Sequence, residues 1–270
     1  VVATPIGNLE EMTPRALHVL ESVDVIAAED TRNTLKLLNY FGIRTRLIAH
    51  HQHNEEQSAN GLLELLRQGK NVAVVSDAGY PLISDPGSVV AKKVMEEGFN
   101  VVPISGSNAM LNALVASGMN TRHFLFYGFL KAQEKERIRE LHELKYYPFT
   151  IVFYEAPHRI EKMLKSCLEV LGNRQICLAR ELTKKHEEFI RGTIEEVLEI
   201  VDDIKGEMVV VIEGCSEEKN PGEDQASPLV HEQIKTYIDG GLTTNEAIKR
   251  VAKELGLSKN DLYKEYHGLS

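Results

Sequence analysis

A chain of 270 residues is long enough for two compact α/β domains and a small appendage, since domains usually contain about 50 to 200 residues. Its composition, 43% hydrophobic and 26% charged, is that of a globular protein, and no apolar run of about 18 residues could form a membrane helix. The formal net charge of −9 argues against non-specific coating of nucleic acid, because that requires many phosphates to be neutralised, but it permits a local basic rim.

The cysteines bear on redox compartment and metal binding. Cys167, Cys177 and Cys215 are scattered, without the paired spacing of a zinc site or a disulfide framework. We therefore expect free thiols in a reducing cytoplasm, and no metal ion.

The first block of the chain, up to about Gly118, alternates short apolar runs with amphipathic stretches. This rhythm predicts βα units and a mostly parallel sheet. Thr13 and Pro14 are typical of a helix start, with a cap residue before a first-turn proline, and a later helix begins near Ser88 and stops at Gly98. The strands predicted here span residues 1–5, 23–28, 46–50, 72–76 and 101–104.

A second block runs from about Arg122 to Gly214. Residues 133–144 read as a charged, exposed helix, whereas apolar residues between Ile160 and Leu171 recur at helical spacing and are interpreted as core. The strands predicted in this block span residues 124–129, 149–154, 175–182, 188–192 and 208–212.

The end of the chain reads as a linker and a helical unit. Residues 215–224 are polar, acidic and broken by Pro and Gly, and two helical candidates follow at 244–255 and 258–267. Their arrangement resembles a helix-turn-helix, but a packing or dimerisation hairpin is at least as good an interpretation, because about six charges of each sign follow Leu229.

These patterns give an α/β fold class. We expect two α/β domains, a parallel sheet and then a mixed sheet, and a small C-terminal helical unit. The expected boundaries are 1–119 and 120–214 for the two domains, 215–228 for the linker and 229–270 for the helical unit.

Four loops of the first block each follow a predicted strand and precede a predicted helix. They therefore lie at the carboxyl edge of the sheet, where ligands bind in open α/β sheets. None contains a G-x-G-x-x-G fingerprint or a G-x-x-x-x-G-K-[ST] phosphate loop, which removes the usual support for NAD binding or nucleotide hydrolysis. An adenosyl sulfonium carries no phosphate and needs instead an apolar slot with a few polar groups. The loops span residues 4–8, 29–32, 76–87 and 105–109.

The longest of these loops presents two carboxylates. Asp77 directly ends an apolar strand, so a ligand role is favoured for it. Asp85 precedes Pro86 at a helix entry, and helix capping and ligand contact are equally good interpretations for it.

Two segments of the second block mix charged and aromatic residues, 154–159 and 179–188. His158 or His186 alone would more often be a solvated surface histidine, and the run from Lys184 to Glu188 an exposed edge. Five segments together resemble the small-subunit ribosomal RNA 2′-O-ribose cytidine methyltransferases, a family within the tetrapyrrole-methylase superfamily. The segments are residues 4–9, 28–32, 76–87, 153–159 and 179–184, and the resemblance covers nearly the whole chain.

The resemblance implies two α/β domains that hold S-adenosylmethionine in the cleft between them, in a homodimer. It implies a cytoplasmic enzyme that methylates a cytidine ribose in the decoding region of 16S ribosomal RNA, in the small ribosomal subunit. The chain departs from the family at 105–109, where Ser-Gly-Ser-Asn-Ala stands in place of Pro-Gly-Pro-Ser-Ala. Only Gly106 and Ala109 carry over directly, so Ser107 and Asn108 are expected to contact the cofactor through their backbone, and contacts of their side chains are not implied.

Methyl transfer is an in-line displacement that depends on positioning and needs no metal, but a ribose hydroxyl is a weak nucleophile that a base or a nearby cation should activate. The catalytic candidates are Glu29, Asp30, Arg32 and Glu155. The expected cofactor contacts are Pro5, Asp77, Ala78, Gly79, Ile83, Gly106, Ser107, Asn108, Ala109, Tyr154 and Leu182. The expected RNA contacts are Arg32, His158, Arg159, Lys184 and Lys185.

A basic rim around the cleft would suit a shaped RNA target within an acidic protein. Two alternatives stay open: a methyltransferase acting on a porphyrin-like ring, and a DNA-binding regulator with the α/β part as ligand sensor. The rim candidates are Arg32, Lys36, Arg44, Arg46, Lys131, Arg159, Lys184 and Lys185.

Overall fold

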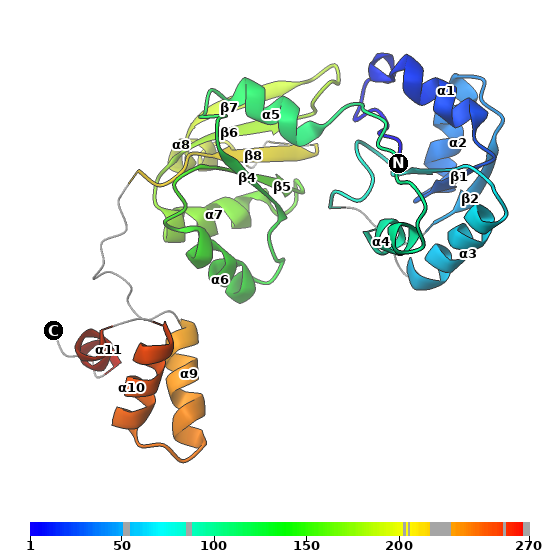
Figure 1. Ribbon diagram of the computed structural model, residues 1–270. Helices are drawn as coiled ribbons and strands as arrows, with labels where there is room; N and C mark the ends of the chain where they lie inside the picture. The colour runs from blue at the N-terminus through cyan, green and yellow to red at the C-terminus, as the bar shows by residue number, and fades with distance from the viewer. Residues whose placement is uncertain are drawn as a thin grey trace. The chain divides into compact units, whose positions relative to one another are not determined.

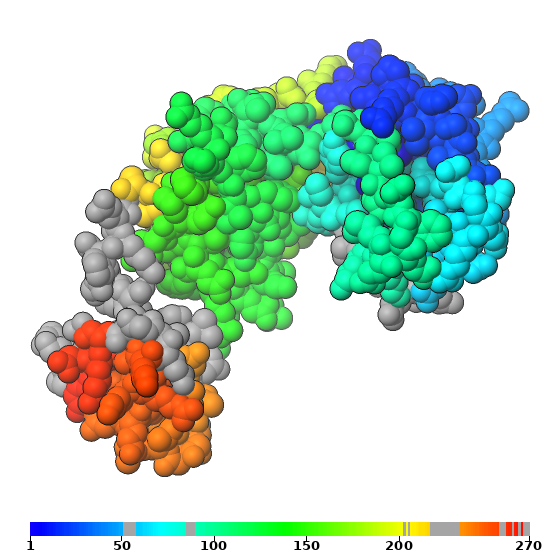
Figure 2. Space-filling model, viewed as in Figure 1, coloured from blue at the N-terminus to red at the C-terminus, as the bar shows by residue number. Residues whose placement is uncertain are grey.

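The computed structural model describes residues 1–50, 55–84, 88–201, 204, 206–216, 228–255 and 258–266. Asp85 and most of the predicted linker lie outside the described residues. The chain divides into two compact units, Val1–Cys215 and Ser216–Ser270. The first unit contains two lobes, which we define as residues 1–108 and residues 109–215. Figure 2 shows the first lobe, blue to cyan, and the second, green to yellow, as two packed bodies.

The first lobe is built on a parallel three-stranded sheet of order β2-β1-β3. Ile26 and Ala28 of the central strand point into the core beneath α1 and α2, whereas Ala27 points into the core beneath α3 and α4, so helices cover both faces (Figure 1). The elements are η1 (Leu9–Glu11), α1 (Pro14–Ser22), β1 (Val25–Ala28), α2 (Thr31–Tyr40), β2 (Arg46–Ala49), α3 (Glu55–Arg67), β3 (Val72–Val75) and α4 (Ser88–Glu96).

Two of the predicted strands of this lobe, residues 1–5 and 101–104, are not strands in the structure. Their pairing is limited to isolated bridges, a parallel one between Val2 and Ile104 and an antiparallel one between Thr4 and Gly79, and the Val2 N–H also donates to the Val74 carbonyl at 2.9 Å. Pro5 and Pro103 have no N–H to donate, which limits pairing to the residues beside them.

The second lobe contains a mixed five-stranded sheet of order β4-β5-β8-β6-β7, in which β8 runs antiparallel to both β5 and β6. Its β6 strand was predicted to reach residue 182 but ends at Arg180, because Glu181 and Thr183 have left-handed backbone that no strand accommodates. The elements are α5 (Ala109–Ser117), β4 (Phe124–Phe129), α6 (Glu134–Leu144), β5 (Thr150–Glu155), α7 (Ile160–Leu171), β6 (Gln175–Arg180), β7 (Glu188–Thr193), α8 (Ile194–Leu198) and β8 (Met208–Ile212).

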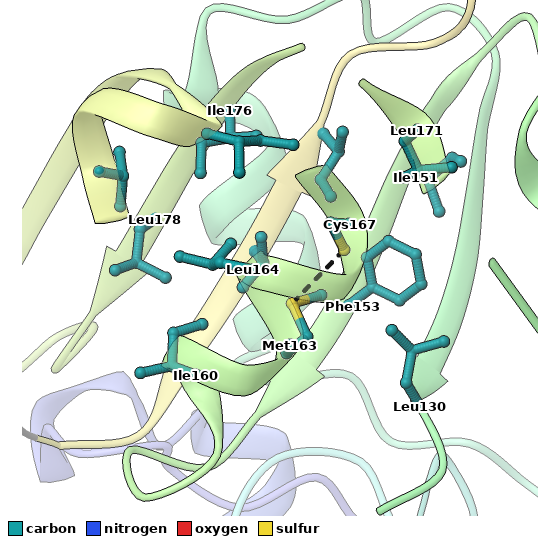
Figure 3. Packing of buried hydrophobic residues seen from close by; sticks show 14 of the residues in the cluster. Leu130, Ile151, Phe153, Ile160, Met163, Leu164, Cys167, Leu171, Ile176 and Leu178 are labelled. Carbon is teal, nitrogen blue, oxygen red and sulfur yellow. Dashed lines mark hydrogen bonds between the residues drawn. The ribbon is translucent and has the colours of Figure 1, made fainter. Parts of the chain in front are cut away.

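Alternation along β5 separates the two cores of this lobe. Ile151 and Phe153 pack under α7, as Figure 3 shows, whereas Val152 packs under α5 on the opposite face. The predicted apolar stripe of α7 is buried in this core, which confirms its interpretation as packing. The expected domain boundary at 119/120 stays a prediction, and α5, which precedes it, packs on the second sheet.

The second unit is helical in its described part, with α9 (Pro228–Asp239), α10 (Thr244–Leu255) and α11 (Lys259–Tyr266). Ile234, Ile248, Val251 and Leu262 form its buried core. None of the helices in the described part of the chain has the length and apolar character needed to cross a membrane.

Candidate functional site

A cavity of about 380 Å³ lies within the first unit, and residues of both lobes line it. Because β1 and β3 are parallel neighbours, their carboxyl ends bring Glu29 and Asp77 to one edge of the first sheet. The lining residues are Ile6, Glu29, Asp77, Ala78, Gly79, Tyr80, Ile83, Ser84, Asn108, Ala109, Phe129, Tyr154, Glu155, Ala156, Pro157, Glu181, Leu182, Lys184, Glu207, Met208 and Val209.

The second lobe contributes to the cavity from strands that run in opposite directions. Glu155 ends β5 and pairs in register with Met208, which begins β8. Met208 is also paired with Arg180, the last residue of β6. The start of one strand therefore lies between the ends of two others, and Glu207, Met208 and Val209 reach the cavity with Glu155 and Leu182.

Backbone strain is concentrated in the two loops beside the cavity. Within the described ranges, the non-glycine residues with left-handed backbone are Leu82 and Ser84 in one loop and Glu181 and Thr183 in the other. Such conformations cost about 1–3 kcal/mol each and gather at functional sites, where the surrounding structure enforces them. Residues 82–84 and 181–183 are therefore candidates for a functional role.

The loop that contains Leu82 and Ser84 is hydrogen-bonded to the start of the chain. Thr4 and Gly79 exchange backbone hydrogen bonds of 2.9 and 3.0 Å, and Gly79 has a φ of 74° that favours glycine. This antiparallel bridge holds the wall formed by Asp77, Ala78 and Gly79 against the cavity.

Glu155 is the most buried carboxyl group of the site, at 2% exposure. Its Oε1 accepts a hydrogen bond from the Ala156 N–H at 2.8 Å and lies 3.2 Å from Arg159 Nε, whereas Oε2 is buried without a hydrogen-bond partner. Burial raises the pKa of Glu155, and the Ala156 N–H and the Arg159 guanidinium offset only part of that shift. This carboxyl group can therefore hold a proton at a higher pH than an ordinary glutamate.

Asp30 and Arg32 do not line the cavity. Asp30 is the N-cap of α2 and accepts from the Arg32 backbone N–H at 2.8 Å, while the Arg32 guanidinium lies 2.7 Å from Asp30 Oδ2. The guanidinium and the capping hydrogen bond hold the pKa of Asp30 well below its usual range. Asp30 is thus a poor proton acceptor, and its observed contacts are those of a helix cap.

The loop that departs from the family pattern makes mostly structural contacts. The Ser107 hydroxyl donates to Glu11 Oε2 at 2.6 Å, and the Gly106 N–H donates to the Tyr80 hydroxyl at 3.3 Å. Asn108 lines the cavity, but its Oδ1 caps α5 by accepting from the Leu111 N–H at 2.9 Å. Gly106 and Ser107 lie outside the cavity lining, as does Pro5.

Two of the basic residues predicted to hold RNA, Arg159 and Lys184, have acidic or carbonyl partners. Arg159 donates to the Leu130 carbonyl at 2.6 Å in addition to its pair with Glu155. Lys184 lines the cavity and lies 3.0 Å from Glu181 Oε1. His158 and Lys185 are exposed and lie outside the cavity lining.

The structure therefore brings together eleven of the predicted residues and leaves out eight. Those in the lining are Glu29, Asp77, Ala78, Gly79, Ile83, Asn108, Ala109, Tyr154, Glu155, Leu182 and Lys184. Those outside it are Pro5, Asp30, Arg32, Gly106, Ser107, His158, Arg159 and Lys185. Sequence reasoning missed Phe129, although it ends β4 and the strand-end rule could have found it.

The charge of the lining selects the kind of ligand. The lining contains five acidic residues, Glu29, Asp77, Glu155, Glu181 and Glu207, and one basic residue, Lys184, whose ammonium group lies 3.0 Å from Glu181 and 3.8 Å from Glu207. Such a set repels polyphosphates and favours a ligand with positive charge, while Ile83, Phe129 and Leu182 offer apolar and aromatic surface. Among the residues described, no three His, Cys, Asp or Glu side chains are grouped to hold a metal ion.

Comparison with known proteins gives one family. The family model described as Tetrapyrrole (Corrin/Porphyrin) Methylases matches residues 1–198. A protein of Bacillus subtilis named ribosomal RNA small subunit methyltransferase I is 49% identical over 99% of this chain and 93% of its own length. A protein of the same name from Haemophilus influenzae is 43% identical over 97% of this chain and 94% of its own length.

Solved structures resemble this chain in fold. The uroporphyrin-III-C-methyltransferase of Thermus thermophilus has a TM-score of 0.57 and 20% identity, over 78% of this chain and 92% of that one. A diphthine synthase has a TM-score of 0.60 and 12% identity, over 79% of this chain and 90% of its own. At these identities the likeness shows the two-lobed α/β fold alone.

Proposed function

Because this chain belongs to the tetrapyrrole methylase family, we propose that it is an S-adenosylmethionine-dependent methyltransferase that modifies the ribose 2′-OH of a cytidine in 16S ribosomal RNA. The observation that carries the proposal is the cavity, which joins apolar walls to a ring of carboxylates and contains no phosphate-binding loop. Relatives of 40–49% identity over nearly the whole chain, named ribosomal RNA small subunit methyltransferase I, support the RNA substrate.

The residues of the cavity suit this cofactor. A volume of about 380 Å³ lies within the range of small-molecule sites, which is about 300–1,000 Å³. The buried and unpartnered Oε2 of Glu155 is a group that a bound cation or donor would satisfy. Asp77 would hold the polar and cationic groups of the cofactor, and Ile83 and Leu182, from the two lobes, its apolar surface.

When bound, the cofactor supplies an electrophilic methyl group, whose bond to sulfur breaks with the electron pair left on sulfur as an oxygen lone pair forms the new bond to carbon. The hydroxyl proton has to leave to a base. Glu155, with its raised pKa, is the proton acceptor we assign, and Glu29 is the second candidate in the lining. Asp30, held by Arg32 at the cap of α2, has a structural role in this scheme.

We place the RNA on exposed cations outside the cavity. Arg32 is 85% exposed at the start of α2, and Arg44, Arg46 and Lys131 are further exposed basic residues. In this proposal the enzyme acts on the small ribosomal subunit in the cytoplasm, and as a homodimer.

A methyl-transfer assay tests the proposal. Purified protein is incubated with S-adenosylmethionine labelled in the methyl group and with small ribosomal subunits that lack the modification. We expect label in 16S RNA, and in a cytidine ribose once the nucleotide is mapped. A parallel incubation contains a tetrapyrrole precursor in place of the subunits, and label in that precursor instead would favour the porphyrin-type alternative, which the family description supports. If the protein shows no saturable binding of S-adenosylmethionine or of its demethylated product, both the RNA and the tetrapyrrole methyltransferase functions are rejected.

A further inference from the structure

A second hollow, of about 320 Å³, lies in the first lobe between the loop of residues 4–9 and α2. We call it the α2 hollow. Asp77 lines both this hollow and the cavity described above. Sequence reasoning assigned a cofactor role to Pro5, and the structure places Pro5 in the lining of the α2 hollow.

The two ends of the α2 hollow differ in chemistry. At one end lie Leu9, Leu37 and Tyr40, and Tyr40 is 66% exposed despite its large aromatic ring. At the other end the Asn33 amide donates to Asp77 Oδ2 at 3.0 Å and accepts from Lys36 Nζ at 3.5 Å. An exposed aromatic ring near an ammonium, an amide and a carboxylate offers partners for the base, the phosphate and the ribose hydroxyls of a nucleotide.

The position of this hollow relative to the cavity limits what it can hold. A methyl acceptor has to lie about 3–3.5 Å from the carbon it attacks, so its binding site must open onto the cofactor's site. The cavity, at about 380 Å³, is near the small end of the range for one small-molecule ligand and leaves little room for a second. The α2 hollow shares the lining residue Asp77 with the cavity, which makes it the candidate site for the acceptor.

We propose that the α2 hollow binds the target pyrimidine nucleotide of the RNA, with its base stacked on Tyr40, its phosphate near Lys36 and its ribose toward Asp77. This inference rests on the proposed function and names the part of the protein that recognises its substrate. It assigns recognition to Asn33, Lys36 and Tyr40, which form one exposed stripe of α2.

Binding measurements on three variants test this assignment. The probe is a labelled, single-stranded oligoribonucleotide rich in cytidine, titrated by fluorescence anisotropy in the presence of S-adenosylhomocysteine. We expect Tyr40→Ala to weaken RNA binding at least about fivefold, since one base stacked on an aromatic ring contributes that much, and Tyr40→Phe to stay within about twofold of the parent. Leu35→Ala is the matched control, because Leu35 is 49% exposed on the same helix but does not line the hollow.

The affinity for S-adenosylhomocysteine, measured by calorimetry, should be the same in all of these proteins. The assignment is overturned if Tyr40→Ala binds RNA as tightly as the parent, or if Leu35→Ala loses as much affinity. Its failure can be told from failure of the proposed function: a parent that methylates small subunits while Tyr40→Ala keeps full RNA affinity rejects only the α2 hollow. A parent that binds no S-adenosylhomocysteine rejects the proposed function itself.

Discussion

Gly7 of the first lobe faces Lys184 of the second so closely that a Cβ on Gly7 would lie 2.6 Å from Lys184 Cγ. The same Cβ would lie 2.9 Å from Thr183 Oγ1 and 3.0 Å from the Leu182 carbonyl. Leu182 and Lys184 line the cavity, so the packing of Gly7 against them fixes the position of one wall of the site.

Gly7→Ala should therefore weaken cofactor binding. The added methyl group has to displace Lys184 and the backbone at Leu182, and overpacking of this kind costs about 1–3 kcal/mol. Calorimetry with S-adenosylmethionine should show a loss of about tenfold, with the fold intact by circular dichroism.

The matched control is Gly61→Ala in α3, where a Cβ meets no atom within 4 Å. It should leave cofactor affinity unchanged and raise helix stability by roughly 0.5–1 kcal/mol. Equal affinity of Gly7→Ala and the parent would show that this wall does not shape the site.

Glu155 should control the pH dependence of the chemical step. Burial raises its pKa, so the ionised form that accepts a proton is lost at a higher pH than for an ordinary glutamate. We expect the single-turnover rate to fall as the pH drops through this raised pKa, and Glu155→Gln to abolish that limb and slow transfer by about 100-fold or more. If Glu29→Gln removes the limb and Glu155→Gln keeps it, Glu29 is the base.

Asp77→Ala should weaken S-adenosylmethionine binding by about tenfold or more, because a charge-assisted hydrogen bond contributes about 1.5–3 kcal/mol. Asn33→Ala is the companion variant, since it removes the donor to Asp77 Oδ2 but keeps the carboxylate. It should lose less cofactor affinity than Asp77→Ala. Unchanged affinity in Asp77→Ala, measured by calorimetry, would remove this residue from the cofactor site.

Arg32→Ala should weaken RNA binding and leave cofactor binding unchanged. Its guanidinium is 85% exposed and lies outside the cavity lining. We expect the slope of log affinity against log salt to decrease by about 0.7–1, the value for one lost phosphate contact. A slope equal to that of the parent would place Arg32 in a role limited to its pair with Asp30.

The sequence by itself determined most of the helices and strands and one edge of the site. Apolar runs followed by helix starts predicted β1 and β3, and parallel strands must end at the same edge, so the pattern alone places Glu29 and Asp77 together. The helical spacing of Met163, Leu164 and Cys167 likewise identified a buried face correctly.

Only the tertiary structure decided the rest of the site. Met208 begins a strand, and its place in the cavity depends on the antiparallel pairing of β8 with β5 and β6, a register set by long-range packing. The approach of Gly7 to Lys184 joins residues 177 positions apart, and the α2 hollow exists only because residues 4–9 fold back beside α2. Local patterns encode the direction and faces of single elements, whereas cavities arise where elements distant in sequence pack together.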